Sequence, residues 1–129
     1  MALCTLLLGT GCSGRQSVYP VTGKVLFENR PAVGALVQFH PEGPADKATL
    51  VPQGEVDANG VFHLTTYTFQ DGAPPGRYRV TVFWGVPAKG GDGYDRILVP
   101  ARYLKPETSG LTAVVLEQAT ELEPFKLTP

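Results

Sequence analysis

The chain has 129 residues, a length that fits one domain. Its formal net charge is −1 and its charges are scattered, so it lacks the basic stripe expected of a nucleic-acid-binding protein. Its 15 glycines and 12 prolines recur between short apolar runs, as in an all-β sandwich or barrel.

The first twelve residues, MALCTLLLGTGC, form a short apolar run that ends in small residues and a cysteine. Spanning a bilayer takes about 20 apolar residues, so this run suits the core of a secretory signal instead. The string LLLGTGCSG resembles a bacterial lipobox, which implies that Cys12 is lipidated and becomes the new N-terminus. Cleavage without lipid and an uncleaved N-terminus are the alternatives.

Cys4 and Cys12 are the two cysteines of the chain, and both lie in this segment. A body cleaved before Cys12 would hold no disulfide, no cysteine-based zinc site and no cysteine nucleophile. We expect a signal peptide over residues 1–12, a polar tether over 13–18 and one β-sandwich domain over 19–129. The protein would be exported and anchored through Cys12 to a membrane of the cell envelope.

Three strands are predicted in the first half of the body. Residues 19–28 alternate apolar and polar side chains, which is typical of a half-buried strand. A second strand directs Val37 and Phe39 inward and His40 outward, and it ends at a proline. Residues 50–56, which contain a proline, are predicted to form an edge strand.

The organising stretch of the chain, residues 54–82, carries its turns in two short motifs. The motif DANG at residues 57–60 predicts a type I turn that closes a hairpin with a bulge, because its glycine accepts positive φ. The returning strand covers residues 61–65. After a crossover, Pro75 and Gly76 predict a type II turn.

The remaining elements follow the cleanest alternation in the chain, YRVTVFW, which predicts a strand over residues 77–84. A glycine-rich mobile surface loop is expected over 85–96, a helical turn over 100–105, and strands over 111–117 and 122–127. About seven strands result. We predict an antiparallel β-sandwich of the immunoglobulin-like class.

Three strings, GKVLFENRPAVGALVQFHPEG, GEVDANGVFHLTTY and GAPPGRYRVTV, resemble the carboxypeptidase regulatory-like domain. The shared features are G-x-V, a D-x-x-G hairpin before an aromatic residue, and P-P-G-x-Y-x-V-x-V. The resemblance covers residues 21–127 and implies a transthyretin-like (prealbumin-like) β-sandwich. The run VPARYLKPETSGLTAVV resembles a segment of small secreted planctomycete-type lipoproteins that carry this domain. A shared fold does not define a function.

Two histidines, His40 and His63, are candidate metal ligands, with Glu42 or Asp46 as a third. Both lie on outward faces by the alternation, so two exposed strand histidines are the alternative. The DANG motif lacks the remaining ligands of a calcium loop, and we interpret it as a turn. No G-x-S-x-G elbow or phosphate loop is present in the sequence, and we expect no cofactor and no catalytic set.

Exposed aromatic side chains are the remaining candidates for a binding surface. Such side chains often mark a glycan or protein interface, although they also pack beneath their own loops. The candidates are Tyr67, Phe69, Phe83 and Tyr94.

The sequence favours a non-catalytic, lipid-anchored structural or interaction module, with an unidentified protein or glycan partner. A carbohydrate-binding module that uses Tyr67, Phe69 or Tyr94 is the alternative. A metal-dependent enzyme built on His40 and His63 is the remote alternative.

Overall fold

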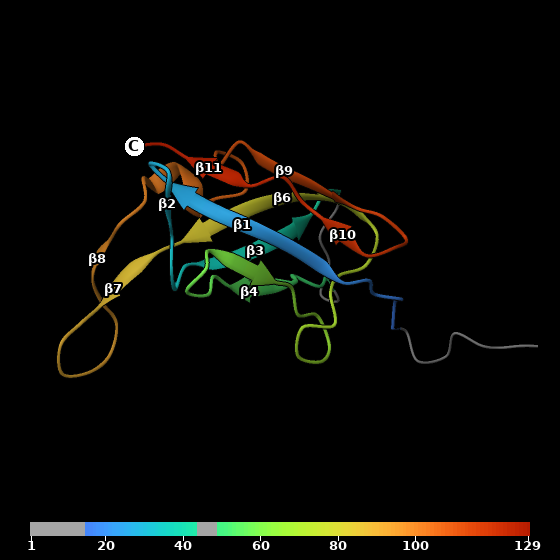
Figure 1. Ribbon diagram of the computed structural model, residues 1–129, viewed down its shortest axis with the longest axis horizontal. Helices are drawn as coiled ribbons and strands as arrows, with labels where there is room; N and C mark the ends of the chain where they lie inside the picture. Colours follow the sequence, from blue (N-terminus) through green and yellow to red (C-terminus); the bar gives the residue numbers. More distant parts are fainter. Residues whose placement is uncertain (1–14, 44–48) are drawn as a thin grey trace, which may run out of the picture.

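The computed structural model describes residues 15–43 and 49–129. Cys12 and Asp46 lie outside the described residues, as does the predicted signal peptide. Within them the chain is an all-β domain, as predicted, with one short 3-10 helix, η1 (Ala101–Leu104) (Figure 1).

Two sheets form the body of the domain. The five strands of the first sheet are β1 (Val21–Phe27), β2 (Arg30–Pro31), β5 (Val61–His63), β10 (Thr120–Glu121) and β11 (Phe125–Leu127). The second sheet has the order β4 (Gln53–Glu55), β3 (Leu36–Pro41), β6 (Gly76–Phe83), β9 (Leu111–Val115). A separate two-stranded ribbon joins β7 (Gly85–Pro87) and β8 (Tyr94–Ile97).

The core lies between the two sheets and is built around Phe39. The Phe39 ring lies 6.1 Å from Phe62 and 6.4 Å from Phe125, both of which belong to the first sheet. It also lies 5.5 Å from Tyr78 of its own sheet. All four rings are at most 8% exposed, and aromatic side chains of this size contribute much of the buried area in such a core. The predicted inward alternation of β3 and β6 is therefore confirmed.

The predicted turn at residues 57–60 is also confirmed. The Gly60 N–H donates to the Asp57 carbonyl at 2.9 Å, and Gly60 has a φ of +83°. The Asp57 carboxylate accepts the N–H groups of Asn59 and Val61 at 2.8 and 3.0 Å. These bonds lower the pKa of Asp57, because they stabilise its ionised form, and the bond from Val61 has the largest effect.

The arms of this turn do not form a simple hairpin, because β4 and β5 belong to different sheets. They are linked through a bridge between Gln53 and Thr65, at the end of the arms away from the turn. Beside this bridge, a Cβ on Gly54 would lie 2.3 Å from the His63 carbonyl oxygen. Gly54 therefore allows the two backbones to approach.

Three other predictions need correction. The sandwich is not purely antiparallel, because β10 and β11 pair in parallel with β1. The alternation of side chains does not show whether two paired strands are parallel or antiparallel. That depends on the path of the chain between them. Gly76 has a φ of +146° and pairs with Val115 of β9. It therefore begins strand β6 and makes no type II turn. Residues 85–96, predicted as a loop, form the β7–β8 ribbon.

Candidate functional site

The structure separates the two histidines. His40 lies on β3 and His63 on β5, each on the outer face of its own sheet, with the core between them. Packed sheets lie about 10 Å apart, so side chains on opposite outer faces cannot share one ion at about 2 Å. Each ring instead meets a threonine, His40 Nε2 at 2.9 Å from Thr81 Oγ1 and His63 Nδ1 at 3.3 Å from Thr22 Oγ1.

The four aromatic candidates form two clusters at opposite ends of the domain. Tyr67 and Phe69 lie in the loop beside the N-terminal segment, where the N–H of Gln16 donates to the Tyr67 hydroxyl at 2.9 Å. At the other end, the rings of Phe83 and Tyr94 meet edge to face at 4.8 Å. The predicted aromatic patch is therefore not one surface.

Exposure differs within each cluster. Phe69 is 84% exposed and Tyr94 is 56% exposed, whereas Tyr67 and Phe83 are half-buried. The guanidinium of Arg15 lies 4.3 Å from the centre of the Tyr67 ring. The two alternatives, an exposed binding surface and rings packed beneath their own loops, therefore each describe one ring of every pair.

The loop that carries Tyr67 and Phe69 is held by the Asp71 carboxylate. This group accepts the N–H groups of Thr66, Tyr67 and Thr68 at 2.8, 3.1 and 2.9 Å. Burial of the carboxylate acts to raise its pKa, but the hydrogen bonds together outweigh burial and the pKa of Asp71 is lowered. Asp71 is therefore ionised at neutral pH and fixes the loop.

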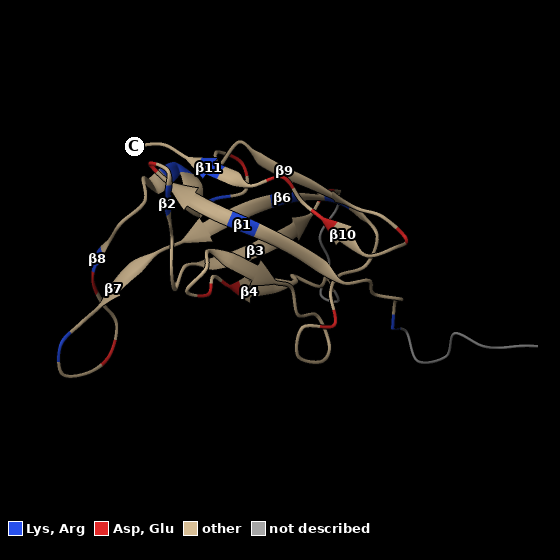
Figure 2. Ribbon diagram, viewed as in Figure 1, with Lys and Arg blue, Asp and Glu red and all other residues tan. Residues whose placement is uncertain are grey.

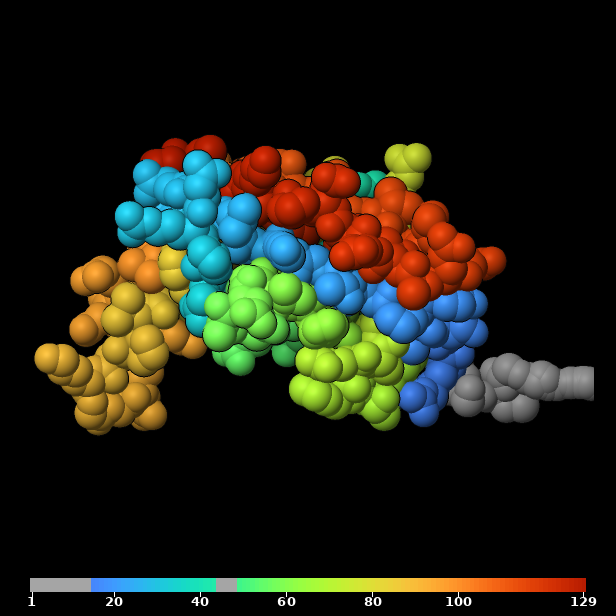
Figure 3. All heavy atoms as spheres, viewed as in Figure 1, coloured from blue at the N-terminus to red at the C-terminus, as the bar shows by residue number. Residues whose placement is uncertain are grey.

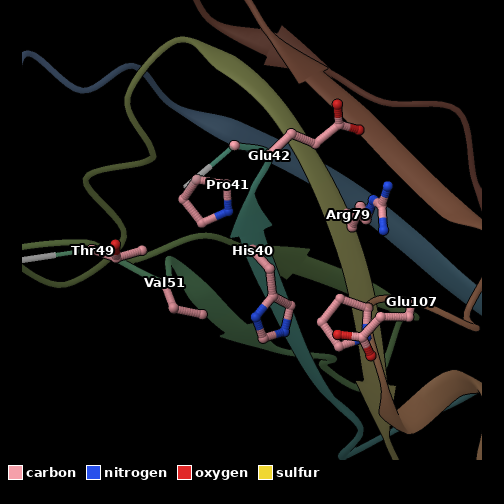
Figure 4. Close-up of a pocket in the computed structure, with 9 residues that line it drawn as sticks. His40, Pro41, Glu42, Thr49, Val51, Arg79 and Glu107 are labelled. Atoms are coloured by element: carbon pink, nitrogen blue, oxygen red, sulfur yellow. The ribbon is translucent and has the colours of Figure 1, made fainter. Parts of the chain in front are cut away.

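Sequence reasoning missed a cleft of about 630 Å³ beside His40 on the outer face of the second sheet (Figure 4). Glu107 reaches this cleft because the segment after η1 folds back, with the Ser109 N–H donating to the Lys105 carbonyl at 3.0 Å. That segment has no apolar period, so no sequence signal placed it near β3. The polar and apolar lining includes His40, Glu42, Thr49, Val51, Arg79 and Glu107.

The cleft combines an imidazole with charged groups of both signs. Burial lowers the pKa of His40, and the Glu107 carboxylate opposes that shift without overcoming it, so the imidazole is neutral at pH 7. Thr81 is 4% exposed, so its hydroxyl orients the imidazole and is not open to a substrate. Arg79 and the two carboxylates add both signs of charge. Among residues 15–43 and 49–129, no three His, Cys, Asp or Glu side chains gather to hold a metal.

Comparison of the chain with protein-family models, with curated proteins and with solved structures gives no match. In the described part of the chain, no helix has the length and apolar character needed to cross a membrane. The carboxypeptidase regulatory-like domain remains an expectation that rests on the sequence motifs.

Proposed function

We propose that this chain is a non-catalytic interaction module, attached by a lipid on Cys12 to a membrane of a bacterial cell envelope. The observation that carries the proposal is the position of the N-terminal segment relative to the ribbon. Tyr19 pairs with Ala73 through two hydrogen bonds of 3.0 Å at the end where β1 begins. The ribbon begins near the end where β1 stops, since the rings of Phe27 and Trp84 lie 6.1 Å apart there.

This arrangement suits an anchored module. Strand β1 has seven residues, which at about 3.3 Å per residue separates the two ends by roughly 20 Å. Figure 3 shows the ribbon standing out from the body on the side opposite the N-terminal segment. A lipid on Cys12 would therefore hold one end of the sandwich at the membrane and direct Tyr94 away from it.

Metabolic labelling with a fatty-acid probe tests the anchor. We expect label on the wild-type chain and none on Cys12→Ala, because the lipid is attached at that cysteine. An unlabelled wild type, or label that persists in Cys12→Ala, contradicts the proposal. Immunoblotting of both chains provides the control for expression.

A carbohydrate-binding module is the second candidate, and the 84% exposure of Phe69 favours it because an open ring offers a face to a sugar. A glycan array with the wild-type chain and with Phe69→Ala tests this role. The candidate requires a signal that Phe69→Ala abolishes. An array at background level removes the candidate.

A further inference from the structure

Strand β9 presents an unprotected edge. It pairs with β6 on one side, and among the described residues no strand pairs with its other side. The sequence LTAVV contains no charge and no proline. Two of the exposed apolar side chains, Val114 and the following Leu116, lie here, each 49% exposed. An edge of this kind is a template for another strand.

The other edges of the two sheets are protected. Strand β4 has three residues, carries the charge of Glu55, and is bridged to Thr65. Strands β10 and β11 have two and three residues, and Pro124 lies between them. Strand β2 ends in Pro31, and β5, which lies on the same side of β1, has three residues. Proline, charge and short length are the usual protections of an edge, so β9 is the exception in this domain.

The hydrogen-bonding pattern identifies which groups of β9 are open. The Glu42 N–H donates to the Arg77 carbonyl at 3.0 Å, which directs the odd-numbered residues of β6 toward β3 and the even-numbered ones toward β9. The even-numbered residues of β6 align with the odd-numbered residues of β9. Thr112 and Val114 therefore direct their N–H and C=O groups away from β6.

A groove runs along this open edge and has a second wall. Its volume is about 480 Å³, and its lining combines residues 110–114 with residues 122–126. Figure 1 shows β11 beside β9 along the upper margin of the domain. Because the second wall stands next to the edge, the groove suits a single extended segment better than the edge of another whole sandwich.

The charges around the groove indicate the chemistry of that segment. Glu123 and Lys126 line the groove, and Glu117 and Glu121 lie in and beside the turn from β9 to β10, where Figure 2 shows acidic residues in red. Strand β9 ends toward these carboxylates, so a segment that pairs antiparallel to β9 begins there. Basic residues at the N-terminal end of the segment would lie near the carboxylates of this turn.

We infer that β9 binds an extended peptide segment of a partner protein by strand addition, antiparallel to β9. The segment is uncharged and β-branched in its middle and carries lysine or arginine at its N-terminal end. Backbone hydrogen bonds to Thr112 and Val114 supply the pairing, and the carboxylates at the end of β9 set its direction. This inference deepens the interaction role proposed above and rests on it.

The test uses two acetylated, fluorescein-labelled peptides, Lys-Lys-Thr-Val-Thr-Val-Thr and Glu-Glu-Thr-Val-Thr-Val-Thr, titrated with the full chain. Fluorescence anisotropy should show binding of the lysine peptide in preference to the glutamate peptide. Val114→Pro should weaken that binding by at least about tenfold, because it removes an open N–H donor. Val114→Thr keeps the N–H and should bind as the wild type does.

Two further variants keep the test decisive. Thr112→Pro removes the other open donor, and circular dichroism of both proline variants shows whether the sheet is retained, as expected for proline at an edge. Glu117→Gln with Glu123→Gln should reduce the preference for the lysine peptide, and added salt should do the same. Unchanged binding in both folded proline variants overturns the inference, as does failure of the wild type to bind either peptide.

Self-association is the competing outcome. A full chain that sediments as a dimer, with Val114→Pro monomeric, would assign the edge to a second copy and overturn the peptide inference. Titrations on Cys12→Ala separate this question from the anchor. Peptide binding that persists there while the wild type takes no fatty-acid label would remove the anchor and leave the strand addition standing.

Discussion

Tyr78 shows how one buried side chain links the core to a loop. Its hydroxyl donates to the Pro74 carbonyl at 2.6 Å, just before β6 begins. Burial raises the pKa of Tyr78 to about 12, since the ionised phenolate would lose its hydration. The hydroxyl therefore stays protonated through the range in which an exposed tyrosine ionises.

This shift predicts a dependence of stability on high pH. The folded-state pKa lies above the ordinary value of 10, so the contribution of Tyr78 is complete below pH 10 and is lost as the pH rises toward about 12. Tyr78→Phe should lack this loss. Urea unfolding of both chains between pH 8 and pH 12 measures it, and equal slopes in the two chains would contradict the assignment.

Asp71 predicts the opposite dependence at low pH. Its folded-state pKa lies below the ordinary value of 3.8, so its contribution is complete above pH 3.8 and is lost as the pH falls through the folded-state value. Asp71→Asn should reduce the free energy of unfolding at pH 7 by about 1 kcal/mol, because the neutral amide accepts hydrogen bonds less strongly. Chemical denaturation at pH 7 and pH 3 measures both effects. A variant whose deficit is as large at pH 3 as at pH 7 would argue against the charged group.

Among the elements, the β7–β8 ribbon is the least integrated. Cβ atoms placed on Gly90, Gly91 and Gly93 at its tip would meet no other atom within 4 Å, so no other described residue packs at these three positions. The base is fixed differently, because Trp84 Nε1 donates to the Val33 carbonyl at 2.8 Å and Phe83 packs on Tyr94. The ribbon thus has a fixed base and an open tip.

Replacing residues 88–93 with Asn-Gly should therefore leave the thermal stability of the sandwich almost unchanged. The two strands would be joined by a tight hairpin turn, for which this dipeptide is favoured. Trp84→Phe, which removes the indole donor at the base, serves as the comparison and should lower the melting temperature more. Calorimetry of the wild type and the two variants measures the melting temperatures. A lower melting temperature for the shortened ribbon than for Trp84→Phe would contradict the distinction between a fixed base and an open tip.

At the scale of the whole molecule, the proposed anchor fixes an orientation that labelling can read. The body from residue 13 onward contains no cysteine, so a single introduced thiol can carry a fluorophore. On vesicles that contain brominated lipids, Gln70→Cys should be quenched more strongly than Asp92→Cys. The reason is that the first lies at the end beside the N-terminal segment and the second at the ribbon tip. Equal quenching at both positions would contradict the orientation.

The sequence predicted local structure well and long-range arrangement poorly, for one physical reason. Alternation placed Phe39 inward and His40 outward, and turn chemistry placed Gly60, because these features depend on residues close in the chain. The sheet to which each strand belongs depends on pairing between distant segments. The position of Glu107 beside His40 also depends on such pairing. No local sequence pattern therefore predicts the cleft.

The pairing of β1 also has a consequence for the order in which the protein forms. Val25 is aligned with Phe125, a separation of 125 − 25 = 100 residues, and Val21 is aligned with Thr120. The sheet that contains the first strand to be synthesised is therefore complete only after the last strand has been made. Contacts this distant in sequence slow folding. For the export proposed above, this delay would favour passage through a translocation channel, because the first sheet is incomplete until the last strand has been made.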